Sequence, residues 1–344
     1  MTTTSTTIPI IDIAPFIDPS SSTDAERTSV ARAWDQAFCT TGFARIVGHG
    51  VSPALIHQFR TQAHAFFAQS HRVKMQYHRG PYGCPLGGYT AVGQEAVSRS
   101  RDGMGSDGGA AEDQKNNARG NEANDSPPPD MVESFVLRHD QMEKDPQALA
   151  QLGEAYRRDM LRVLTSLHEL SATALLGSDQ KDFFVPFYDT TDQHSLRLGY
   201  YPACTEESLK MQHRGAMRYG EHTDYTGFTI LLQDEGDSAS STGGGLQVKL
   251  PDGTFHSVAA VPGSFVVNIG DMFQVWTNDR WKSTVHRVAA PNSPCGPRLS
   301  IPFFSGPNNA AQIAPILIEP GETAKHETIT AGEHLWRKLQ ATQT

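Results

Sequence analysis

A histidine and an aspartate separated by one residue are the first candidates for chemistry in this sequence. His222 and Asp224 lie in the segment EHTDY, residues 221–225. On an extended chain alternate side chains point to the same face, about 6.6 Å apart along the strand. An imidazole and a carboxylate can then converge on one ion. Because the pattern His-x-Asp is common by chance, a metal site needs a third ligand.

His286 is the candidate for that third ligand. It stands among β-branched residues in TVHRV, residues 284–288, which indicates a strand on which His286 faces away from Val285 and Arg287. Two histidines and one carboxylate form the facial triad that is typical of non-haem Fe(II) oxygenases. The set contains no thiolate, and its carboxylate and imidazoles suit ferrous iron. The histidines at 49, 194, 256 and 334 are interpreted as ordinary core or surface residues.

Arg298 and Ser300 follow His286 and share one face of the next predicted strand. A planar guanidinium beside a hydroxyl is a suitable clamp for a carboxylate. Charge-assisted hydrogen bonds of this kind contribute roughly 1.5–3 kcal/mol each. Together with the facial triad, this pair predicts a site that holds a metal and a carboxylate-bearing ligand.

These residues lie in a part of the chain that reads as β-structure. Short runs of β-forming residues recur from about residue 195, separated by Gly, Pro, Asn and Asp, which is typical of a sandwich or jelly roll. The runs are 196–201, 228–232, 246–250, 255–258, 264–269, 272–276, 284–288 and 299–304. We therefore expect a mainly β fold with flanking helices and a double-stranded β-helix core.

The first half of the chain is predicted to be mostly helical. Thr23 and Glu26 form a capping box before a helix that reaches about Cys39. Two further helices are expected, at about 52–70 and 146–176, with strands at 8–13 and 43–47. A last helix begins near Thr330. We divide the chain into a helical region, 1–180, and a β-helix oxygenase domain with a C-terminal helix, 181–344.

Residues 99–130 differ in composition from the rest of the chain. They are rich in Gly, Asn, Asp and Pro and contain almost no large apolar residue, so a packed element could not offset its ordering entropy. We interpret the segment as a mobile insertion. Its sequence leaves open whether it is a loop without a role or a flap over the site.

Charge and composition exclude several classes of protein. The chain has 29 Lys+Arg against 38 Asp+Glu, a formal charge of −9, which argues against a nucleic-acid partner. No run approaches the roughly 18 apolar residues of a membrane span, and no basic residue precedes Arg27, so we expect no signal peptide. The four cysteines form no CxxC pair. Free thiols, a cytoplasmic location and a monomer are the expectations.

The motifs occur in an order that resembles the iron- and 2-oxoglutarate-dependent dioxygenases of the isopenicillin-N-synthase-like group. In the second half they are HTD (222–224), GGLQV (244–248), GSFVVNIGD (263–271), HRV (286–288) and RLS (298–300). In the first half they are IPIID (8–12), GF (42–43), GHGV (48–51), GY (88–89) and ESF (133–135). The resemblance covers nearly the whole chain outside the insertion.

The resemblance implies a jelly roll whose mouth holds the iron. It implies that His222, Asp224 and His286 bind Fe(II) and that Arg298 and Ser300 bind the distal carboxylate of 2-oxoglutarate. Tyr201 matches a tyrosine that also contacts 2-oxoglutarate, in GYYP (199–202). Gly199 replaces the asparagine of the family's motif, which removes one amide contact. The cofactors would be Fe(II), 2-oxoglutarate and O2, with ascorbate as a stimulant.

The resemblance leaves the substrate open beyond a small-molecule metabolite. Hydroxylation, desaturation, demethylation, cyclisation and ethylene formation all use the same iron residues. Glu95 and Arg197, with Tyr89 and Phe135, fall where relatives place substrate-facing loops, but we interpret them as structural. Two alternatives remain: an iron oxidase of the same fold that does not use 2-oxoglutarate, and a metal-binding relative without turnover. A zinc hydrolase would tolerate the triad but would not explain Arg298 and Ser300.

Overall fold

The computed structural model describes residues 7–80, 87–95, 130–189, 193–211, 217–234 and 245–341. The predicted insertion lies outside these residues except for Asp130, as does Gly244 of the GGLQV motif. Among the described helices, none combines the length and the apolar composition needed to cross a bilayer.

Two sheets, antiparallel except for the parallel pair β1–β2, form the core of the molecule. The larger has eight strands in the order β1-β2-β10-β7-β12-β5-β4-β3, and the smaller has four in the order β6-β11-β8-β9. The strands are β1 Ile10–Asp12, β2 Phe43–Val47, β3 Gly88–Thr90, β4 Glu133–Leu137, β5 Ser195–Tyr201, β6 Met217–His222, β7 Phe228–Gln233, β8 Leu246–Lys249, β9 Phe255–Ser257, β10 Phe265–Ile269, β11 His286–Ala289 and β12 Arg298–Phe304, with a separate hairpin of β13 Gln312–Ile313 and β14 Ile329–Thr330. The expected jelly-roll architecture is confirmed.

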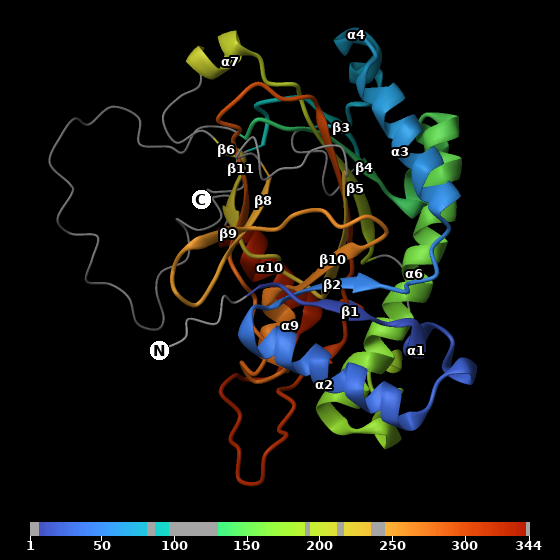
Figure 1. Cartoon of the computed structure of the whole chain (residues 1–344), viewed down its shortest axis with the longest axis vertical. Helices are drawn as coiled ribbons and strands as arrows, with labels where there is room; N and C mark the ends of the chain where they lie inside the picture. The colour runs from blue at the N-terminus through green and yellow to red at the C-terminus, as the bar shows by residue number, and fades with distance from the viewer. Residues whose placement is uncertain are drawn as a thin grey trace, which may run out of the picture.

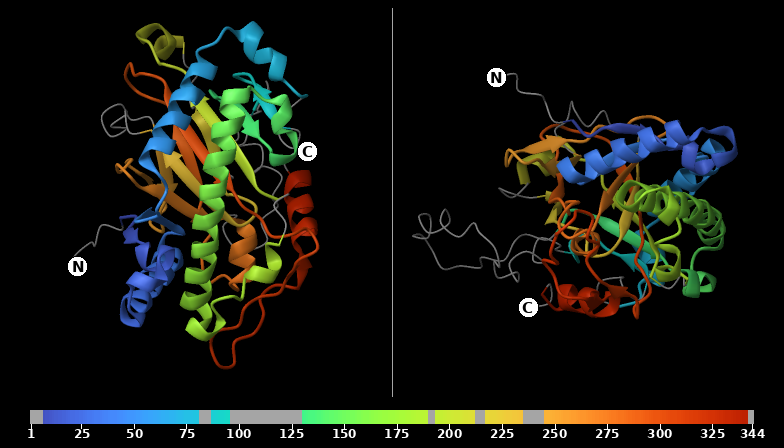
Figure 2. Two further views of the ribbon diagram at one scale, coloured as in Figure 1. Left: turned by 90° about the vertical axis from the view of Figure 1, so that its right-hand side faces the viewer. Right: turned by 90° about the horizontal axis from the view of Figure 1, so that it is seen from below.

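Helices cover the outer face of the large sheet. Figure 1 shows α3 and α6 on the side of the molecule away from the small sheet. In the left view of Figure 2, where that side faces the viewer, the two helices lie in front of the strands. The α-helices are α1 Ala14–Ile17, α2 Asp24–Thr40, α3 Pro53–Phe67, α4 His71–Lys74, α6 Gln147–Leu176, α7 Glu206–Met211, α9 Asp271–Trp276 and α10 Ala331–Ala341. Short 3-10 turns occupy Pro19–Ser21, Met75–Tyr77, His139–Lys144, Ser178–Gln180 and Val185–Phe187.

Alternation along β12 separates the hydrophobic core from the site. Leu299, Ile301 and Phe303 point toward the helices and belong to the main hydrophobic cluster. Arg298 and Ser300 therefore point the other way, toward the small sheet. The main cluster contains residues from both halves of the chain, and β1–β4 extend the sheet that β5, β7, β10 and β12 begin. The predicted division near residue 180 thus crosses one sheet and one core.

Local sequence signals account for the long helices. Thr23 and Glu26 form the predicted capping box at the start of α2, with each side chain bonded to the backbone N–H of the other residue. Ser52 accepts from Leu55 N at the start of α3. The helix α6 ends at Gly177, whose φ of +92° suits glycine.

One predicted strand, 272–276, is wrong. The segment is the helix α9, which buries Met272, Phe273 and Trp276 on one face. A spacing of one and four residues between buried side chains is helical, but a five-residue apolar run does not distinguish helix from strand by periodicity. In the structure Asp271 N and Met272 N donate to the Asp224 and Tyr225 carbonyls, so tertiary contacts set the start of the helix.

Two buried histidines should make the fold acid-sensitive. Burial is the main cause that lowers the pKa of His168 to about 3, and the neighbouring His194 is the second cause. Burial likewise lowers the pKa of His194 to about 4, with the positive charge of Arg157 as the second cause. Below pH about 6.5 the unfolded chain protonates these residues while the native state does not, so stability falls as the pH falls toward about 4. Each contributes roughly 1.4 kcal/mol per pH unit in that window.

Urea unfolding between pH 7 and pH 4.5 tests this expectation. The stability of His168→Gln should fall less steeply with decreasing pH than that of the wild type, by about one bound proton. A control variant at the exposed His139 should keep the wild-type slope. Equal slopes for wild type and His168→Gln would contradict the assignment.

Candidate active site

Two histidines face each other across the small sheet. His222 is the last residue of β6 and His286 is the first of β11, and the two are direct partners in the antiparallel register. Their rings lie 4.2 Å apart between centroids. The pairing joins residues that are 64 positions apart in the sequence (286 − 222), so sheet register rather than local spacing brings them together.

Asp224 completes the cluster from the segment that follows β6. Its Oδ1 atom lies 3.8 Å from Nε2 of His222 and 3.8 Å from Nε2 of His286. The three potential ligand atoms all lie within 4.8 Å of one another, and the three side chains are only 10–11% exposed. The strand ends at His222, so Asp224 lies two residues along the chain from one ligand but just outside the strand.

Backbone carbonyls orient both imidazoles. Nδ1 of His222 lies 2.8 Å from the Gly220 carbonyl oxygen, and Nδ1 of His286 lies 3.0 Å from that of Thr284. With Nδ1–H as the donor, the lone pair of each Nε2 points toward Asp224. Burial, with His286 second, lowers the pKa of His222 to about 3, so this ring is neutral as a metal ligand requires.

The second oxygen of Asp224 is held by two donors. Thr229 Oγ1 and Asn268 Nδ2 each donate to Oδ2 over 2.6 Å. Burial opposes ionisation of this carboxyl, but the neighbouring histidines and these hydrogen bonds outweigh it, so its pKa is lowered. The carboxylate therefore presents one oxygen, Oδ1, to a metal. Two imidazole nitrogens and one carboxylate oxygen fit Fe(II) with open positions for other ligands.

Loss of a donor to Asp224 Oδ2 should weaken metal binding. We expect Thr229→Val, which keeps the side-chain shape, to lower Fe(II) affinity about tenfold, and the double variant Thr229→Val/Asn268→Leu to lower it further, toward about 100-fold. Anaerobic Fe(II) titration followed by equilibrium dialysis measures this. Thr226→Val is the matched control, because Thr226 Oγ1 donates to Ser305 O and not to Asp224. Equal affinities for all variants would refute the role.

A charged link connects the segment after β6 to the C-terminal helix. Thr223 Oγ1, between the two candidate ligands, donates to Asp271 Oδ2 over 3.1 Å. Lys338 of α10 lies 2.8 Å from the same oxygen. These contacts stabilise the segment that carries Asp224, and the residues that make them lie far apart in the sequence.

Arg298, Ser300 and Tyr201 lie on the sheet face that carries Thr229 and Asn268. Register pairs connect them: Asn268 opposes Thr229, Thr229 opposes Phe304, and Phe304, Ser300 and Arg298 alternate on β12. Directly opposed and alternate residues share a face. Arg298 opposes Tyr201, and its guanidinium lies 5.2 Å from the centre of that ring. Arg298 and Tyr201 are 2% exposed and Ser300 is 7% exposed. The structure thus places five of the six predicted site residues on strands of the two sheets, and the sixth, Asp224, in the segment between β6 and β7.

The sheet face that carries Arg298, Ser300 and Tyr201 forms one wall of the site, and a buried ion pair completes this wall. Arg197 of β5 bonds Glu95 over 2.7 Å, with side chains 11% and 16% exposed, and its guanidinium lies 4.9 Å from the Tyr219 ring centre. Tyr219 packs edge-on against His222. A Cβ at Gly199 would lie 3.1 Å from Arg197 Nη1, so Arg197 occupies the space left by the missing asparagine side chain. The sequence analysis interpreted this pair as structural, and the structure places it next to Tyr219, which contacts His222.

Tyr89 and Phe135, which the sequence analysis grouped with Glu95 and Arg197, are buried packing residues. Tyr89 is 1% exposed and donates from its hydroxyl to Glu133, which also pairs with Lys74. Phe135 is fully buried in the main cluster.

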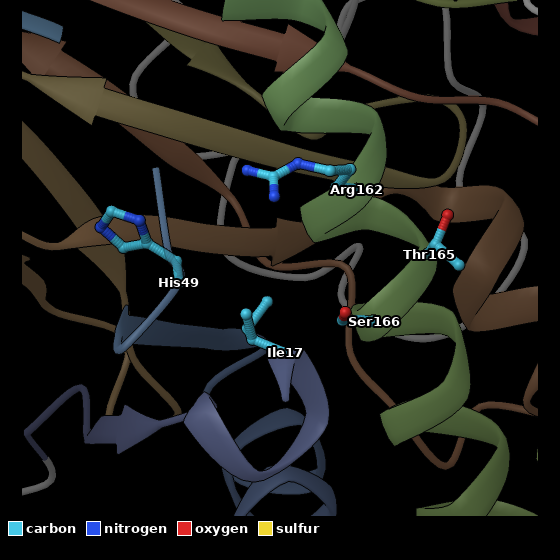
Figure 3. Close-up of a pocket in the computed structure, with 5 residues that line it drawn as sticks. All are labelled: Ile17, His49, Arg162, Thr165 and Ser166. Atoms are coloured by element: carbon cyan, nitrogen blue, oxygen red, sulfur yellow. The ribbon is translucent and has the colours of Figure 1, made fainter. Parts of the chain in front are cut away.

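A cavity of about 270 Å³ lies away from the triad. Figure 3 shows its lining residues on α1, on the loop after β2 and on α6. They are Ile17, His49, Arg162, Thr165 and Ser166. None of them belongs to the metal cluster or to the wall around Arg298.

Comparison with known proteins identifies the family. A sequence model of the 2OG-Fe(II) oxygenase superfamily matches residues 192–307, and a model of the N-terminal region of the non-haem dioxygenases in morphine synthesis matches residues 8–156. Gibberellin 2-beta-dioxygenase 2 of Arabidopsis thaliana is 30% identical over 315 residues, which cover 91% of this chain and 78% of the relative. The chain belongs to the 2OG-Fe(II) oxygenase superfamily.

Other members of the superfamily match over almost their whole length. Homoarginine-6-hydroxylase 2-ODD-233 of Oryza sativa is 29% identical, with 96% of each chain covered. The crystal structure of full-length Neurospora crassa T7H in complex with alpha-KG (2-oxoglutarate) superposes with a TM-score of 0.76 at 28% identity. It covers 97% of this chain and 96% of the T7H chain. The protein is accordingly a 2-oxoglutarate- and Fe(II)-dependent dioxygenase that uses O2 and acts on small molecules.

Proposed function

We propose that His222, Asp224 and His286 bind the Fe(II) of this dioxygenase, and that Arg298, Ser300 and Tyr201 hold 2-oxoglutarate. The observation that carries the proposal is the convergence of two Nε2 atoms and one carboxylate oxygen beside a buried arginine. When bound, the iron couples decarboxylation of 2-oxoglutarate to oxidation of a substrate C–H bond, with release of succinate and CO2. The buried walls orient the reactants and exclude water.

Arg298 would bind the distal carboxylate of 2-oxoglutarate through its guanidinium. A strand in the middle of a sheet positions such an anchor rigidly, and β12 lies between β7 and β5. Ser300 would add a hydroxyl donor from the same face, and Tyr201 would contact the ligand from β5.

The substrate would be a small metabolite with a polar group. Arg197 and Glu95 support this proposal, because they bring hydrogen-bond donors and an acceptor to the wall beside Tyr219 and His222. The relatives are named for different molecules, including homoarginine, gibberellin and scopoletin, so their names do not select a substrate here. We further propose that the enzyme belongs to the isopenicillin-N-synthase-like group, is a monomer and is located in the cytoplasm.

Succinate formation tests the proposed function. The protein is loaded with Fe(II) and ascorbate and given 2-oxoglutarate in air without any substrate. Slow succinate release is expected, and it should stop when Fe(II) is removed with a chelator. Bound iron without succinate would instead favour the oxidase that does not use 2-oxoglutarate. Failure to bind iron would favour the relative without turnover.

A further inference from the structure

Two cysteines that are far apart in the sequence lie directly opposite each other beside the proposed 2-oxoglutarate site. Cys204 N donates to the Cys295 carbonyl over 2.9 Å, and Cys295 N donates to the Cys204 carbonyl over 3.0 Å. Such a pair, which exchanges both hydrogen bonds, has Cα atoms about 5.5 Å apart. Disulfides span Cα distances of about 4.4–6.8 Å. Both thiols are free in the structure.

The cysteine pair continues the ladder that carries Arg298 and Tyr201. Arg298 opposes Tyr201 in the β5–β12 pairing, and Cys295 and Cys204 are each three residues further along in the same register. Pro202 and Pro297 stand between the two pairs, and they interrupt the ladder because proline has no N–H to donate. A covalent bond between the cysteines would therefore join β5 and β12 beyond the end of their regular pairing, next to Arg298 and Tyr201, which we call the keto-acid clamp.

Arg218 connects the cysteines to the clamp. Its Nη2 lies 3.2 Å from Cys295 Sγ and 3.4 Å from the Pro202 carbonyl. Its guanidinium also lies 5.7 Å from the centre of the Tyr201 ring. The Arg218 guanidinium is thus a hydrogen-bond donor to the Cys295 sulfur. Cys295 is half-buried between exposed residues, whereas Cys204 is buried, so Cys295 is the thiol that a small oxidant reaches first.

We propose that Cys204 and Cys295 are a reversible modification site, which a low-molecular-weight disulfide such as oxidised glutathione converts into a cross-strand disulfide that weakens 2-oxoglutarate binding. The Cys295 thiolate attacks one sulfur of oxidised glutathione and expels one glutathione thiolate. The Cys204 thiolate then attacks Cys295 Sγ and expels the second. The cysteine pair loses two electrons and two protons, and glutathione disulfide gains them as two thiols.

The effect on the clamp follows from geometry. Opposed Cβ atoms in a sheet are about 4.5–5.5 Å apart, and a disulfide brings them to about 3.8 Å. Closure therefore draws the two strand ends together and moves Cys295 Sγ relative to Arg218 Nη2, which shifts the Arg218 contact with Tyr201. The part of the proposal that concerns 2-oxoglutarate rests on the proposed function, whereas formation of the disulfide does not.

The test uses the full chain with the other two cysteines replaced, Cys39→Ser/Cys84→Ser. Burial, with Asp35 second, raises the pKa of Cys39 to about 11, so its removal takes away an unreactive thiol. After treatment with oxidised glutathione, intact mass should show loss of two hydrogens, peptide mapping should link residues 204 and 295, and dithiothreitol should reverse both. The melting temperature should rise by about 5 °C, and the KM for 2-oxoglutarate should rise at least threefold.

The matched control adds a third replacement, Cys295→Ser. Treatment of this variant with oxidised glutathione should change neither its melting temperature nor its KM for 2-oxoglutarate. Stable glutathione adducts without a linked peptide would overturn the proposal. A linked peptide with an unchanged KM would overturn the coupling to the clamp. Absence of turnover in the reduced protein would refute the proposed function and leave the mass result to decide the disulfide.

Discussion

Replacement of Asp224 by alanine should abolish iron binding and turnover together. Oδ1 of Asp224 is the only carboxylate oxygen within 3.8 Å of both histidine Nε2 atoms among the described residues. Without it, only the two imidazoles would remain as protein ligands. Since loss of an outer hydrogen-bond partner costs about 10–100-fold in metal affinity, loss of the ligand itself should cost more than about 100-fold.

Two measurements check the Asp224→Ala expectation. Equilibrium dialysis reports Fe(II) binding, and succinate release reports turnover of 2-oxoglutarate. Asp252→Ala is a suitable control, because that carboxylate is 58% exposed and lies in a turn away from the triad. Oxygen uptake that still depends on the keto acid in Asp224→Ala would show that the triad is assigned wrongly.

Replacement of Arg298 by alanine should act on 2-oxoglutarate and not on iron. Two charge-assisted hydrogen bonds worth roughly 1.5–3 kcal/mol each correspond to a rise of about 100-fold or more in the KM for 2-oxoglutarate. Arg298→Lys keeps the charge but loses the planar two-point contact, so it should lie between the alanine variant and the wild type. Fe(II) affinity should stay within about twofold, because Arg298 is not a candidate ligand.

Steady-state succinate release at varied 2-oxoglutarate gives the KM. Arg162→Ala controls for loss of an arginine, because Arg162 is 62% exposed on α6. An unchanged KM in Arg298→Ala would mean that another cation anchors the keto acid.

Local signals in the sequence were sufficient for the long helices α2, α3 and α6, for α10 and for most strands of the core. The capping box at Thr23 and Glu26 and the glycine after Leu176 act within a few residues, so their outcome does not depend on the rest of the fold. The strands β3, β4 and β6 were not predicted from sequence periodicity. The first two flank the compositionally unusual insertion, and β6 is a polar strand, MRYGEH, with weak β-forming character.

The six site residues could be named from motifs, but their arrangement could not. The pairing of His222 with His286 is a register between distant strands, and register is set by tertiary packing. Tertiary packing likewise sets the hydrogen bonds from Thr229 and Asn268 to Asp224 and the position of the cysteine pair beside Arg218. Spacing along the chain suggested that His222 and Asp224 share one site, but the strand itself ends at His222 and Asp224 follows it.

The central claim is that one site holds Fe(II) and 2-oxoglutarate together, with His222, Asp224 and His286 on the metal. Anaerobic addition of 2-oxoglutarate to the Fe(II)-loaded protein tests it most directly by visible absorption spectroscopy. A chelating keto acid should produce a charge-transfer band that needs both additions, that is absent in Asp224→Ala, and that requires far more 2-oxoglutarate in Arg298→Ala. A band of full strength in Asp224→Ala, or none in the wild type with iron bound, would contradict the account.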